Sequence, residues 1–272
     1  MEGVRRWLVD ISGWNPSEHR FQSLLSLLPP QQQPQVTRFV KLEDRKRALV
    51  SRLLQYSLVT DVLGIPFDKI SILHTTEGKP YLKNKEKLLY PNFNYSVSHH
   101  GDYVGVACEP ICLVGFDIVS ITKPQMETTL QYLNNFMPYF TPFEWDNIVH
   151  AGPSNNTLTE FYRYWCLKEA YVKAIGAGLG FGLNRLEFHH NNWTDIYLCI
   201  DGIRSDNWRF FIFELENNHL ACVAKGHPKE AIESYQVTLT MDSFDEEEYL
   251  HAVEFPEPGF ISLVVDQLVI QS

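Results

Sequence analysis

The chain has 272 residues, 44% of them hydrophobic and 21% charged, and its formal net charge is −10. This length is enough for one large domain or two medium ones with a sizeable core, and the composition is that of a soluble globular protein. No apolar run approaches the roughly 18 residues of a membrane span, so we expect no membrane protein. The acidic balance and the lack of a recognition motif argue against a nucleic-acid-binding protein.

The charge is unevenly distributed along the chain. Residues 242–272 hold eight acidic side chains and no lysine or arginine, so the rest of the chain is nearly neutral. Within that rest, a basic patch is formed by Arg38, Lys41, Arg45, Lys46, Arg47 and Arg52. This patch could attract phosphates or an acidic protein, or it could be only the solvent-facing side of a helix.

The cysteines are few, odd in number and without a C-x-x-C pair: Cys108, Cys112, Cys166, Cys199 and Cys222. This pattern favours a reducing compartment and argues against a disulfide framework and a structural zinc site. The N-terminal segment passes directly into a strand pattern, and its two arginines are too few for a transit peptide. We therefore expect a cytoplasmic protein and leave an organellar pool open.

Hydrophobic periodicity in the first half predicts four strands and two helices. The strands are expected at 4–11, 69–74, 93–98 and 103–108, and the helices at 18–28 and 43–63. Gly64 and Pro66 end the second helix, and the Gln- and Pro-rich segment before it is predicted to be a loop. Gly78-Lys79-Pro80 and His100-Gly101-Asp102 are predicted turns.

The second half repeats this order of elements. Strands are expected at 111–120, 185–190, 195–201, 208–214 and 220–225, and helices at 126–137, from Thr141 onward, and at 158–175. Asn217-Asn218 has the composition of a hairpin turn. The acidic stretch 242–248 is typical of a solvated appendage, whereas 260–270 could pack as a strand.

The shared order predicts an α+β fold of two similar subdomains packed as a pseudo-twofold dimer within one chain. Sequence identity between the halves is negligible, so this is a repeat of pattern alone. We place the subdomains at 1–112 and 113–240, the second one carrying the site, and an acidic C-terminal extension at 241–272. Clefts between such units are favoured ligand sites.

The helix at 158–175 places three charges within an otherwise apolar segment. Thr157 and Glu160 form a predicted capping box at its start, and Gly176 ends it. One face is apolar, with Tyr164, Leu167, Tyr171, Ala174 and Ile175; a second face carries Trp165, Lys168, Glu169, Val172 and Lys173. The charges could form an ordinary surface pair at i and i+4. Glycines at 176, 178, 180 and 182 favour instead a ligand lying against backbone.

Two further segments carry candidate ligand groups. Asp117 ends an apolar strand, where it would be costly to bury without a cation, although it could also cap the next turn. A carboxylate pair with Glu169 would suit Mg²⁺. Ser98 and His99 lie at a strand end and could bind phosphate, but neighbouring strand residues face opposite ways, so a Ser–His nucleophile pair is not expected. By the same argument, His189-His190 is predicted to be structural.

In combination, these segments resemble the 4′-phosphopantetheinyl transferases. The matching motifs are Glu77-Gly78-Lys79-Pro80, the Ser98-His99 turn, Gly115-Phe116-Asp117 and W-x-x-K-E-x-x-x-K at 165–173. Their order resembles the monomeric two-repeat (Sfp-like) branch, especially the eukaryotic α-aminoadipate-semialdehyde dehydrogenase type, over about residues 4–226. Each motif alone is weak, but the combination is specific.

The resemblance implies a holo-[acyl-carrier-protein] synthase that moves the 4′-phosphopantetheine arm of coenzyme A to a serine of an acyl or peptidyl carrier protein, releasing adenosine 3′,5′-bisphosphate. It implies a monomer with Mg²⁺ as cofactor and coenzyme A as co-substrate. Asp117, Glu169 and Lys173 are the implied catalytic residues, and the first two are the implied Mg²⁺ ligands. The implied coenzyme A contacts are Thr75, Thr76, Gly78, Lys79, Pro80, Ser96, Ser98, His99, Lys168, Glu169 and Lys173.

The chain departs from the family pattern in two respects. Val119 stands where many relatives place a third acidic metal ligand, so water is expected to complete the metal shell. Arginines of relatives fall on Gln35 and His74, which leaves Lys46, Arg47 or His99 for the adenosine 3′-phosphate. The alternative function is a non-catalytic coenzyme A or nucleotide binder that partners a carrier protein, and the sequence does not specify which carrier.

Overall fold

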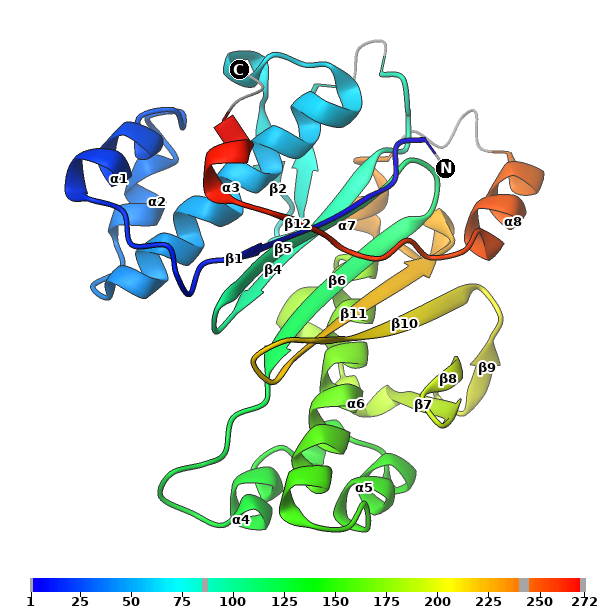
Figure 1. Ribbon diagram of the computed structural model, residues 1–272. Coiled ribbons are helices and arrows are strands. Elements are labelled where there is room, and N and C mark those ends of the chain that lie inside the picture. The colour runs from blue at the N-terminus through cyan, green and yellow to red at the C-terminus, as the bar shows by residue number, and fades with distance from the viewer. Residues whose placement is uncertain (1, 85–87, 240–244, 270–272) are drawn as a thin grey trace.

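Two sheets, each covered by one long helix, form the centre of the protein (Figure 1). The computed structural model describes residues 2–84, 88–239 and 245–269. The first half contains β1 (Arg5–Asp10), α1 (Glu18–Leu25), α2 (Gln33–Thr37), α3 (Leu42–Leu63), β2 (Ile72–His74), β3 (Pro80–Leu82), β4 (Asn94–His100) and β5 (Tyr103–Glu109). No helix in the described part is long and apolar enough to span a membrane.

The rest of the chain provides the second sheet and a C-terminal segment. Its elements are β6 (Leu113–Ser120), α4 (Thr129–Asn134), α5 (Pro142–Val149), α6 (Ser154–Ile175), β7 (Leu186–Asn191), β8 (Thr194–Ile200), β9 (Ile203–Ser205), β10 (Trp208–Leu215), β11 (His219–Gly226), α7 (Glu233–Gln236), α8 (Glu246–Glu254) and β12 (Ile261–Leu263).

The two halves have the same topology. The first half builds a sheet in the order β1-β5-β4 and the second in the order β6-β11-β10, and every neighbouring pair in these orders is antiparallel. In each half the long helix follows the first of these strands and packs on the sheet, α3 on β5 and β4, and α6 on β6 and β11. The predicted α+β fold of two similar subdomains is confirmed. The predicted division after residue 112 falls in the β5–β6 connection.

Side chains, rather than a backbone ladder, join the two sheets where β4 lies beside β6. Alternate side chains of β4 accept hydrogen bonds from alternate backbone N–H groups of β6. The bonds run from Val114 N to Asn94 Oδ1 (2.9 Å), Phe116 N to Ser96 Oγ (3.0 Å), Ile118 N to Ser98 Oγ (3.2 Å) and Ser120 N to His100 Nδ1 (3.2 Å). The period of two follows from strand geometry, so one face of β4 serves the whole seam.

The long helix α6 begins earlier than predicted. It starts at Ser154, after Pro153, so Thr157 lies inside the helix and does not cap it. The Thr157 hydroxyl donates to Gly152 O at 3.2 Å. Glu160 does not close a capping box, because it accepts a hydrogen bond from Trp193 Nε1 at 3.2 Å. The predicted end is confirmed, since Gly176 adopts φ 78° and its N–H bonds to Val172 O.

Most other predicted elements are present with shifted ends. The predicted loop before α3 contains the short helix α2, and the predicted strand 69–74 is only β2, because Phe67–Lys69 forms a 3₁₀ turn. A capping box between Thr128 and Gln131 starts α4 and shortens the helix predicted at 126–137. The hairpin turn between β10 and β11 is confirmed, with φ of 55° at Asn217 and 54° at Asn218.

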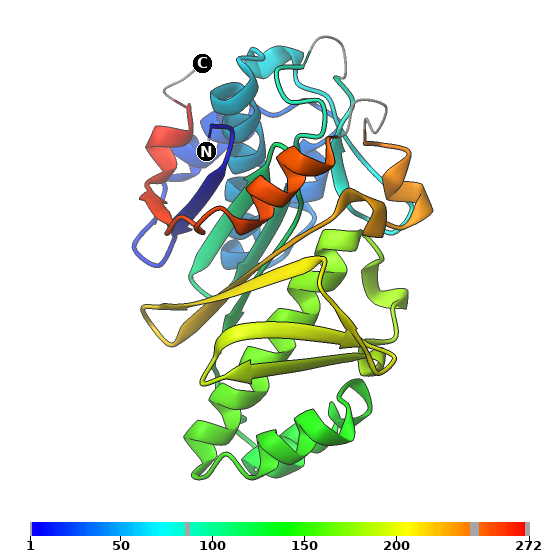
Figure 2. The same ribbon diagram turned by 90° about the vertical axis from the view of Figure 1, so that its right-hand side faces the viewer.

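The C-terminal segment packs back along the N-terminal half (Figure 2). β12 lies in the 260–270 region, which was predicted to pack as a strand, and it pairs in parallel with β1. Val265 and Leu268 pack into the hydrophobic core of the first half. Part of the acidic stretch 242–248 lies outside the described residues, and its remainder begins α8. The exposed acidic side chains of the first turn of α8 are favourable at a helix N-terminus.

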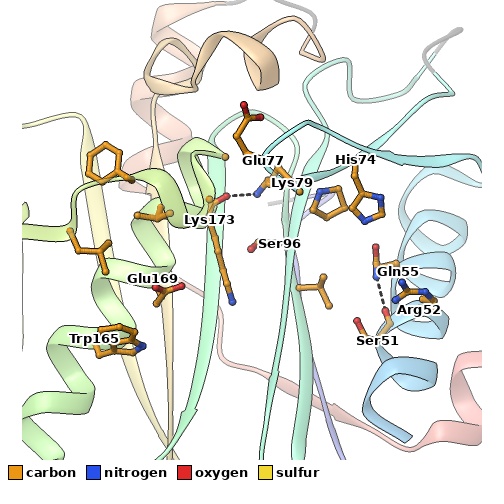
Figure 3. A pocket seen from close by; sticks show the side chains of 18 of the residues that line it. Ser51, Arg52, Gln55, His74, Glu77, Lys79, Ser96, Trp165, Glu169 and Lys173 are labelled. Atoms are coloured by element: carbon orange, nitrogen blue, oxygen red, sulfur yellow. Dashed lines mark hydrogen bonds between the residues drawn. The ribbon is translucent and has the colours of Figure 1, made fainter. Parts of the chain in front are cut away.

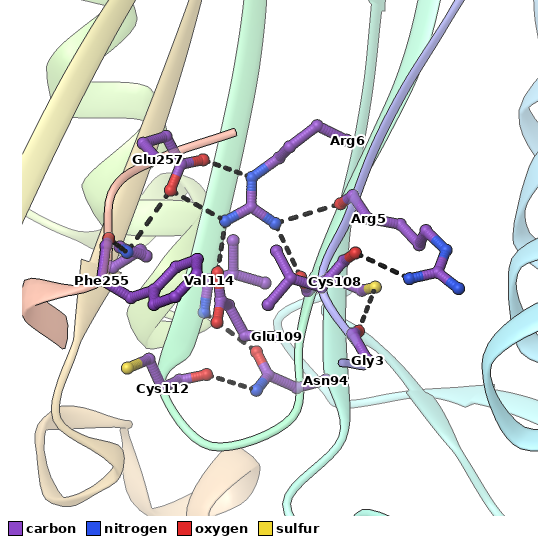
Figure 4. A network of polar contacts seen from close by, with 12 residues as sticks. Gly3, Arg5, Arg6, Asn94, Cys108, Glu109, Cys112, Val114, Phe255 and Glu257 are labelled. Atoms are coloured by element: carbon purple, nitrogen blue, oxygen red, sulfur yellow. Dashed lines mark hydrogen bonds and ion pairs between the residues drawn. The ribbon is translucent and has the colours of Figure 1, made fainter. Parts of the chain in front are cut away.

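A buried charge network fixes this segment to the sheet (Figure 4). The Arg6 guanidinium on β1 binds the carboxylates of Glu109 and Glu257, and it also donates to Cys108 O at 2.6 Å. Lys225 Nζ lies 3.4 Å from Glu257 Oε2. All four charged side chains are at most 3% exposed, and two positive charges balance two negative ones. The two glutamates outweigh the effect of burial and raise the pKa of Arg6.

We expect Glu257→Gln to lower the free energy of unfolding by about 2 kcal/mol, because it removes a charged partner from a buried network and leaves a net positive charge. Urea unfolding measures this loss. Glu254→Gln is the matched control, since the Glu254 side chain is 62% exposed and its pair with Arg209 should contribute no more than about 0.5 kcal/mol. Equal effects of the two substitutions would contradict a structural role for the network.

Candidate active site

A cavity of about 590 Å³ opens between the two halves. Figure 3 shows its two walls, with Trp165, Glu169 and Lys173 of α6 on one side and Ser51, Arg52 and Gln55 of α3 on the other. Its remaining lining residues are His74, Glu77, Gly78, Lys79, Pro80, Ser96, Val97, Tyr139, Val172, Gly176, Gly178, Phe181 and Leu183. The cavity therefore lies in the predicted cleft between the subdomains.

Three predicted site residues form one hydrogen-bonded cluster beside this cavity, and of the three only Lys173 lines it. Lys173 Nζ lies 2.6 Å from Asp117 Oδ1 and donates to Ser98 Oγ at 2.9 Å. The Ser98 hydroxyl in turn donates to Asp117 Oδ1 at 2.9 Å. The cluster joins β4, β6 and α6, so it spans the seam between the halves.

Glu169 lies one helical turn before Lys173 on the cavity wall. Burial and the nearby Asp117 carboxylate raise the pKa of Glu169, while Lys173 opposes the shift. Residues 117 and 169 are therefore close enough for their charges to interact. The described residues contain no group of three or more His, Cys, Asp or Glu side chains that could hold a metal ion, so any cation here would have two protein carboxylates.

A close approach of β6 to α6 brings the two carboxylates together. A Cβ atom at Gly115 would lie 1.7 Å from Ala170 O and 2.6 Å from Ala174 N, so the strand passes directly against the helix backbone. Only glycine permits this contact. Two residues further along β6, Asp117 O accepts a contact from Cys166 Sγ at 3.4 Å, and the Asp117 side chain faces Lys173.

Lys79 is a second cation at the cavity, and the predicted turn positions it there. Thr75 N bonds to Lys79 O at 2.9 Å, and Gly78 adopts φ 93°, which closes the turn. The Lys79 ammonium donates to Val114 O at 3.0 Å and to Lys173 O at 2.8 Å and lies above the Tyr235 ring. It is 6% exposed and has no carboxylate partner among the described residues. Burial, and next Lys173, lower the pKa of Lys79 to about 7.

We expect Lys79→Met to stabilise the protein more at low pH than at high pH. The unfolded chain keeps the lysine protonated up to about pH 10, so between pH 7 and pH 10 unfolding takes up a proton and the wild type gains stability as pH rises. Below pH 7 the ammonium is charged in both states, and its burial penalty is complete. In urea unfolding, the advantage of the variant should shrink by about 2 kcal/mol between pH 6.5 and pH 8.5.

Lys83→Met, at an exposed position beyond β3, is the control for this pH series. A constant difference between wild type and Lys79→Met across the pH range would contradict the lowered pKa.

Lys168 does not lie where the sequence places it. Its side chain is fully buried, pairs with Glu144 of α5 at 2.7 Å, and donates to Leu183 O and Leu186 O. Glu144 also accepts from the Phe188 backbone N–H, so the pair fastens α5, α6 and β7 together. The structure therefore contradicts a direct contact between Lys168 and a ligand in the cavity. It supports a positioning role behind the cavity wall.

Other predicted residues fall outside the cavity lining. Thr75 Oγ1 accepts from Lys79 N at 3.2 Å and holds the turn, Thr76 is exposed, and His99 is exposed at the end of β4. Ser98 lies behind the lining, in the cluster with Asp117. Val119 is buried in the core of the second half, so it supplies no ligand.

The histidine pair that the sequence analysis assigns to structure is indeed used in packing. His189 stacks on Tyr197 at 4.9 Å and on Phe143, while His190 stacks on Trp193 at 3.8 Å. The two imidazoles turn to different neighbours, as expected for adjacent strand residues.

The basic patch was predicted to attract phosphates, but the residues of α3 that line the cavity differ from the ones proposed for the adenosine 3′-phosphate. Lys46 pairs with Glu43 at 3.1 Å, and Arg47 donates to Gly101 O and Asp44, so neither lines the cavity. Ser51, Arg52 and Gln55 do. The signal that could have revealed them is the spacing of these three polar residues at i, i+1 and i+4 within a largely apolar segment of the helix.

Comparison with known proteins gives consistent matches over most of the chain. A family model described as "4′-phosphopantetheinyl transferase, N-terminal" matches residues 12–111, and one described as "4′-phosphopantetheinyl transferase superfamily" matches residues 113–224. The L-aminoadipate-semialdehyde dehydrogenase-phosphopantetheinyl transferases of Mus musculus and Homo sapiens are 35% and 34% identical to this chain, covering 84% of it and 76% of the relatives. A phosphopantetheinyl transferase of Thraustochytrium is 33% identical, covering 82% of this chain and 79% of that protein.

Two solved structures show a more distant likeness. The holo-[acyl-carrier-protein] synthase of Thermotoga maritima has a TM-score of 0.31 at 15% identity, covering 43% of this chain and 64% of its own. The ACPS–CoA complex of Chronobacterium ammoniagenes has a TM-score of 0.31 at 17% identity, covering 42% of this chain and 95% of its own.

Proposed function

Because the chain belongs to the 4′-phosphopantetheinyl transferase superfamily, we propose that it transfers the 4′-phosphopantetheine arm of coenzyme A to a serine of an acyl or peptidyl carrier protein. Adenosine 3′,5′-bisphosphate is the second product. The observation that supports this proposal best is the cluster of Asp117, Ser98 and Lys173 beside Glu169, at the edge of a cavity of about 590 Å³. Such a cavity lies within the size range of small-molecule sites.

The donor set of this cluster fits a magnesium ion. Mg²⁺ prefers oxygen ligands, keeps several waters, and is commonly bound through one or two carboxylates together with substrate phosphates. Asp117 and Glu169 supply two carboxylates whose charges interact. The Lys173 ammonium, whose Nζ lies 2.6 Å from Asp117 Oδ1, is the cation that this carboxylate now binds. When bound, Mg²⁺ would neutralise and orient the diphosphate oxygens of coenzyme A.

The chain's own residues can perform the remaining tasks of the transfer. The carrier serine oxygen forms a bond to the β-phosphorus, and the bond from that phosphorus to the bridging oxygen of the leaving adenosine bisphosphate breaks. Lys173 and Lys79 place ammonium groups at the cavity, where charge develops on phosphate oxygens. Glu169, whose pKa is raised by burial, is the proposed acceptor of the proton of the serine hydroxyl.

We also propose a cytoplasmic monomer. Both walls of the cavity come from one chain, so no second copy is needed to complete it. All five cysteines are free, and four of them are buried, which suits a reducing compartment. Light scattering of the purified protein tests the oligomeric state, and cell fractionation tests the location.

The transfer itself is tested by mass spectrometry of an apo carrier protein incubated with the purified chain, coenzyme A and Mg²⁺. The expected result is a carrier heavier by one phosphopantetheine arm, attached to a serine. A panel of fatty-acid, polyketide, peptide-synthetase and lysine-pathway carriers identifies the preferred partner. Binding of coenzyme A without a mass gain on any carrier would favour a non-catalytic binder and would falsify the proposal.

A further inference from the structure

Lys79 differs from the other buried lysines of the described part of the chain in what holds its ammonium group. The others each pair with a glutamate; they are Lys46, Lys168 and Lys225. The Lys79 ammonium instead donates to two carbonyl oxygens, Val114 O at 3.0 Å and Lys173 O at 2.8 Å. Its Nζ also lies 5.2 Å from the centroid of the Tyr235 ring, which is within the range of a cation–π contact. Partial charges therefore hold this cation, and no formal negative charge neutralises it.

This arrangement leaves part of the ammonium for a ligand. An ammonium has three N–H donors, and the two carbonyl oxygens take two of them. Figure 3 shows Lys79 at the cavity with its hydrogen bond to Lys173 O. Tyr235 does not line this cavity; it lines a separate small cavity of about 10 Å³. Tyr235 therefore contacts the cation without contacting a ligand in the larger cavity.

Tyr235 lies in α7, which packs on the end of α6. The Ile232 N–H, just before α7, donates to Ile175 O of the last residue of α6 at 3.0 Å. A Cβ atom at Gly176 would lie 3.0 Å from both Cβ and Cδ1 of Tyr235. Tyr235 thus packs directly on the glycine that ends α6, so the helix that carries Lys173 also fixes the place of the Tyr235 ring.

The same short helix contacts the turn that carries Lys79. The Ser234 hydroxyl donates to Glu77 Oε2 at 2.5 Å. Gly178 also packs on this turn, since a Cβ atom there would lie 2.8 Å from Glu77 O. The turn of the first half is thus held against the second half at the cavity, with the Lys79 ammonium over the Tyr235 ring.

The ring, and not the hydroxyl, is the part of Tyr235 that this contact uses. Tyr235 is 1% exposed, and its hydroxyl has no hydrogen-bond partner in the described part of the chain. A buried polar group without a partner costs free energy, so the hydroxyl does not explain an aromatic residue at this position. The negative face of the ring does explain it, because it attracts a cation.

We propose that Tyr235 is a positioning residue, whose ring face holds the Lys79 ammonium at the cavity without neutralising it, so that the ammonium binds phosphate oxygens of coenzyme A. This inference rests on the proposed function. A carboxylate in place of the ring would compete with the phosphates for the cation, whereas the ring leaves the positive charge available.

The test measures kcat/KM for coenzyme A with one apo carrier protein. Tyr235→Leu removes the ring and should lower kcat/KM by about 3- to 30-fold, the factor that corresponds to a desolvated cation–π contact. Tyr235→Phe keeps the ring and should restore kcat/KM to within about twofold of wild type. In urea unfolding, Tyr235→Phe should be at least as stable as wild type, because it removes a buried hydroxyl without a partner.

A double-mutant cycle with Lys79→Met distinguishes positioning from general support of the fold. In the Lys79→Met background, Tyr235→Leu should change kcat/KM by less than about twofold, because no ammonium remains to be held. An equal loss in both backgrounds would overturn the proposal. So would a Tyr235→Phe enzyme that is as impaired as Tyr235→Leu.

Tyr197→Leu is the matched control. The Tyr197 ring also lies beneath a cation, with the Arg204 guanidinium 4.3 Å from its centroid, but it does not line the cavity. Its loss should leave kcat/KM within about twofold of wild type. All variants are assayed below their unfolding transitions.

Calorimetry with coenzyme A, without a carrier protein, separates failure of this inference from failure of the proposed function. If wild type binds coenzyme A and transfers nothing, the proposed function fails, and the same cycle in binding affinity still decides on Tyr235. A loss of affinity in Tyr235→Leu that disappears in the Lys79→Met background would support the inference. Wild-type affinity of Tyr235→Leu would refute it, and a wild type that does not bind coenzyme A would overturn both.

Discussion

Glu169→Gln is expected to lower kcat/KM for phosphopantetheine transfer by about 100- to 10,000-fold, the range that general acid–base groups contribute. Glutamine has the same shape but cannot accept the serine proton and is a poorer partner for a cation. The lost charge lies on the wall of the cavity beside Asp117, where burial raises the pKa of the carboxyl. Affinity for coenzyme A, measured by calorimetry, should stay within about tenfold, or roughly 1.4 kcal/mol.

Glu160→Gln provides the control for this substitution. Glu160 lies on the same helix, two and a half turns earlier, and accepts a hydrogen bond from Trp193 Nε1 outside the cavity. Its replacement should leave transfer within about twofold, because a partly exposed hydrogen bond contributes little to a distant site. Full activity of Glu169→Gln would remove Glu169 from the mechanism.

Gly115→Ala is expected to destabilise the protein by about 4 kcal/mol or more, or to prevent folding. The added Cβ would lie 1.7 Å from Ala170 O and 2.6 Å from Ala174 N. Both are backbone atoms of α6, so no side chain can rotate away and the strand must move from the helix. Because Asp117 follows two residues later, its carboxylate would move from Lys173 and Glu169 as well. Urea unfolding and transfer activity should both show the loss.

Gly13→Ala is the comparison for this prediction, since nothing lies within 4 Å of a Cβ at Gly13. It should change the free energy of unfolding by less than about 1 kcal/mol. A Gly115→Ala protein with wild-type stability would show that β6 and α6 do not approach as closely as described here.

Local patterns were sufficient to predict most elements and the motif residues of the site. Hydrophobic periodicity and glycine stops predicted α3 and α6 with ends at Gly64 and Gly176, both of which adopt left-handed φ values. The same periodicity placed Glu169 and Lys173 on one face of α6, and both line the cavity. Such signals act over three or four residues, so one sequence contains them in full.

Periodicity failed where a side chain's partner is remote. It placed Lys168 beside Glu169 at the site, yet Glu144 of α5 draws the ammonium into the core at 2.7 Å. It also gave no partner for Glu257, which pairs with Arg6, 251 positions earlier in the chain. Arg52 was one of six similar residues in a basic patch, and only the packing of α3 separates it from Lys46 and Arg47.

By itself, the sequence determined the elements, the repeated order of the two halves, and the residue types that the chemistry needs. Only the tertiary structure decided that β6 runs against α6 at Gly115 and that the Asp117, Ser98 and Lys173 side chains meet. It also decided that Arg52 lies at the opposite wall of the same cavity. The physical reason is that helix and strand signals depend on neighbouring residues, whereas burial, charge pairing and cavity shape depend on contacts between segments far apart in the chain.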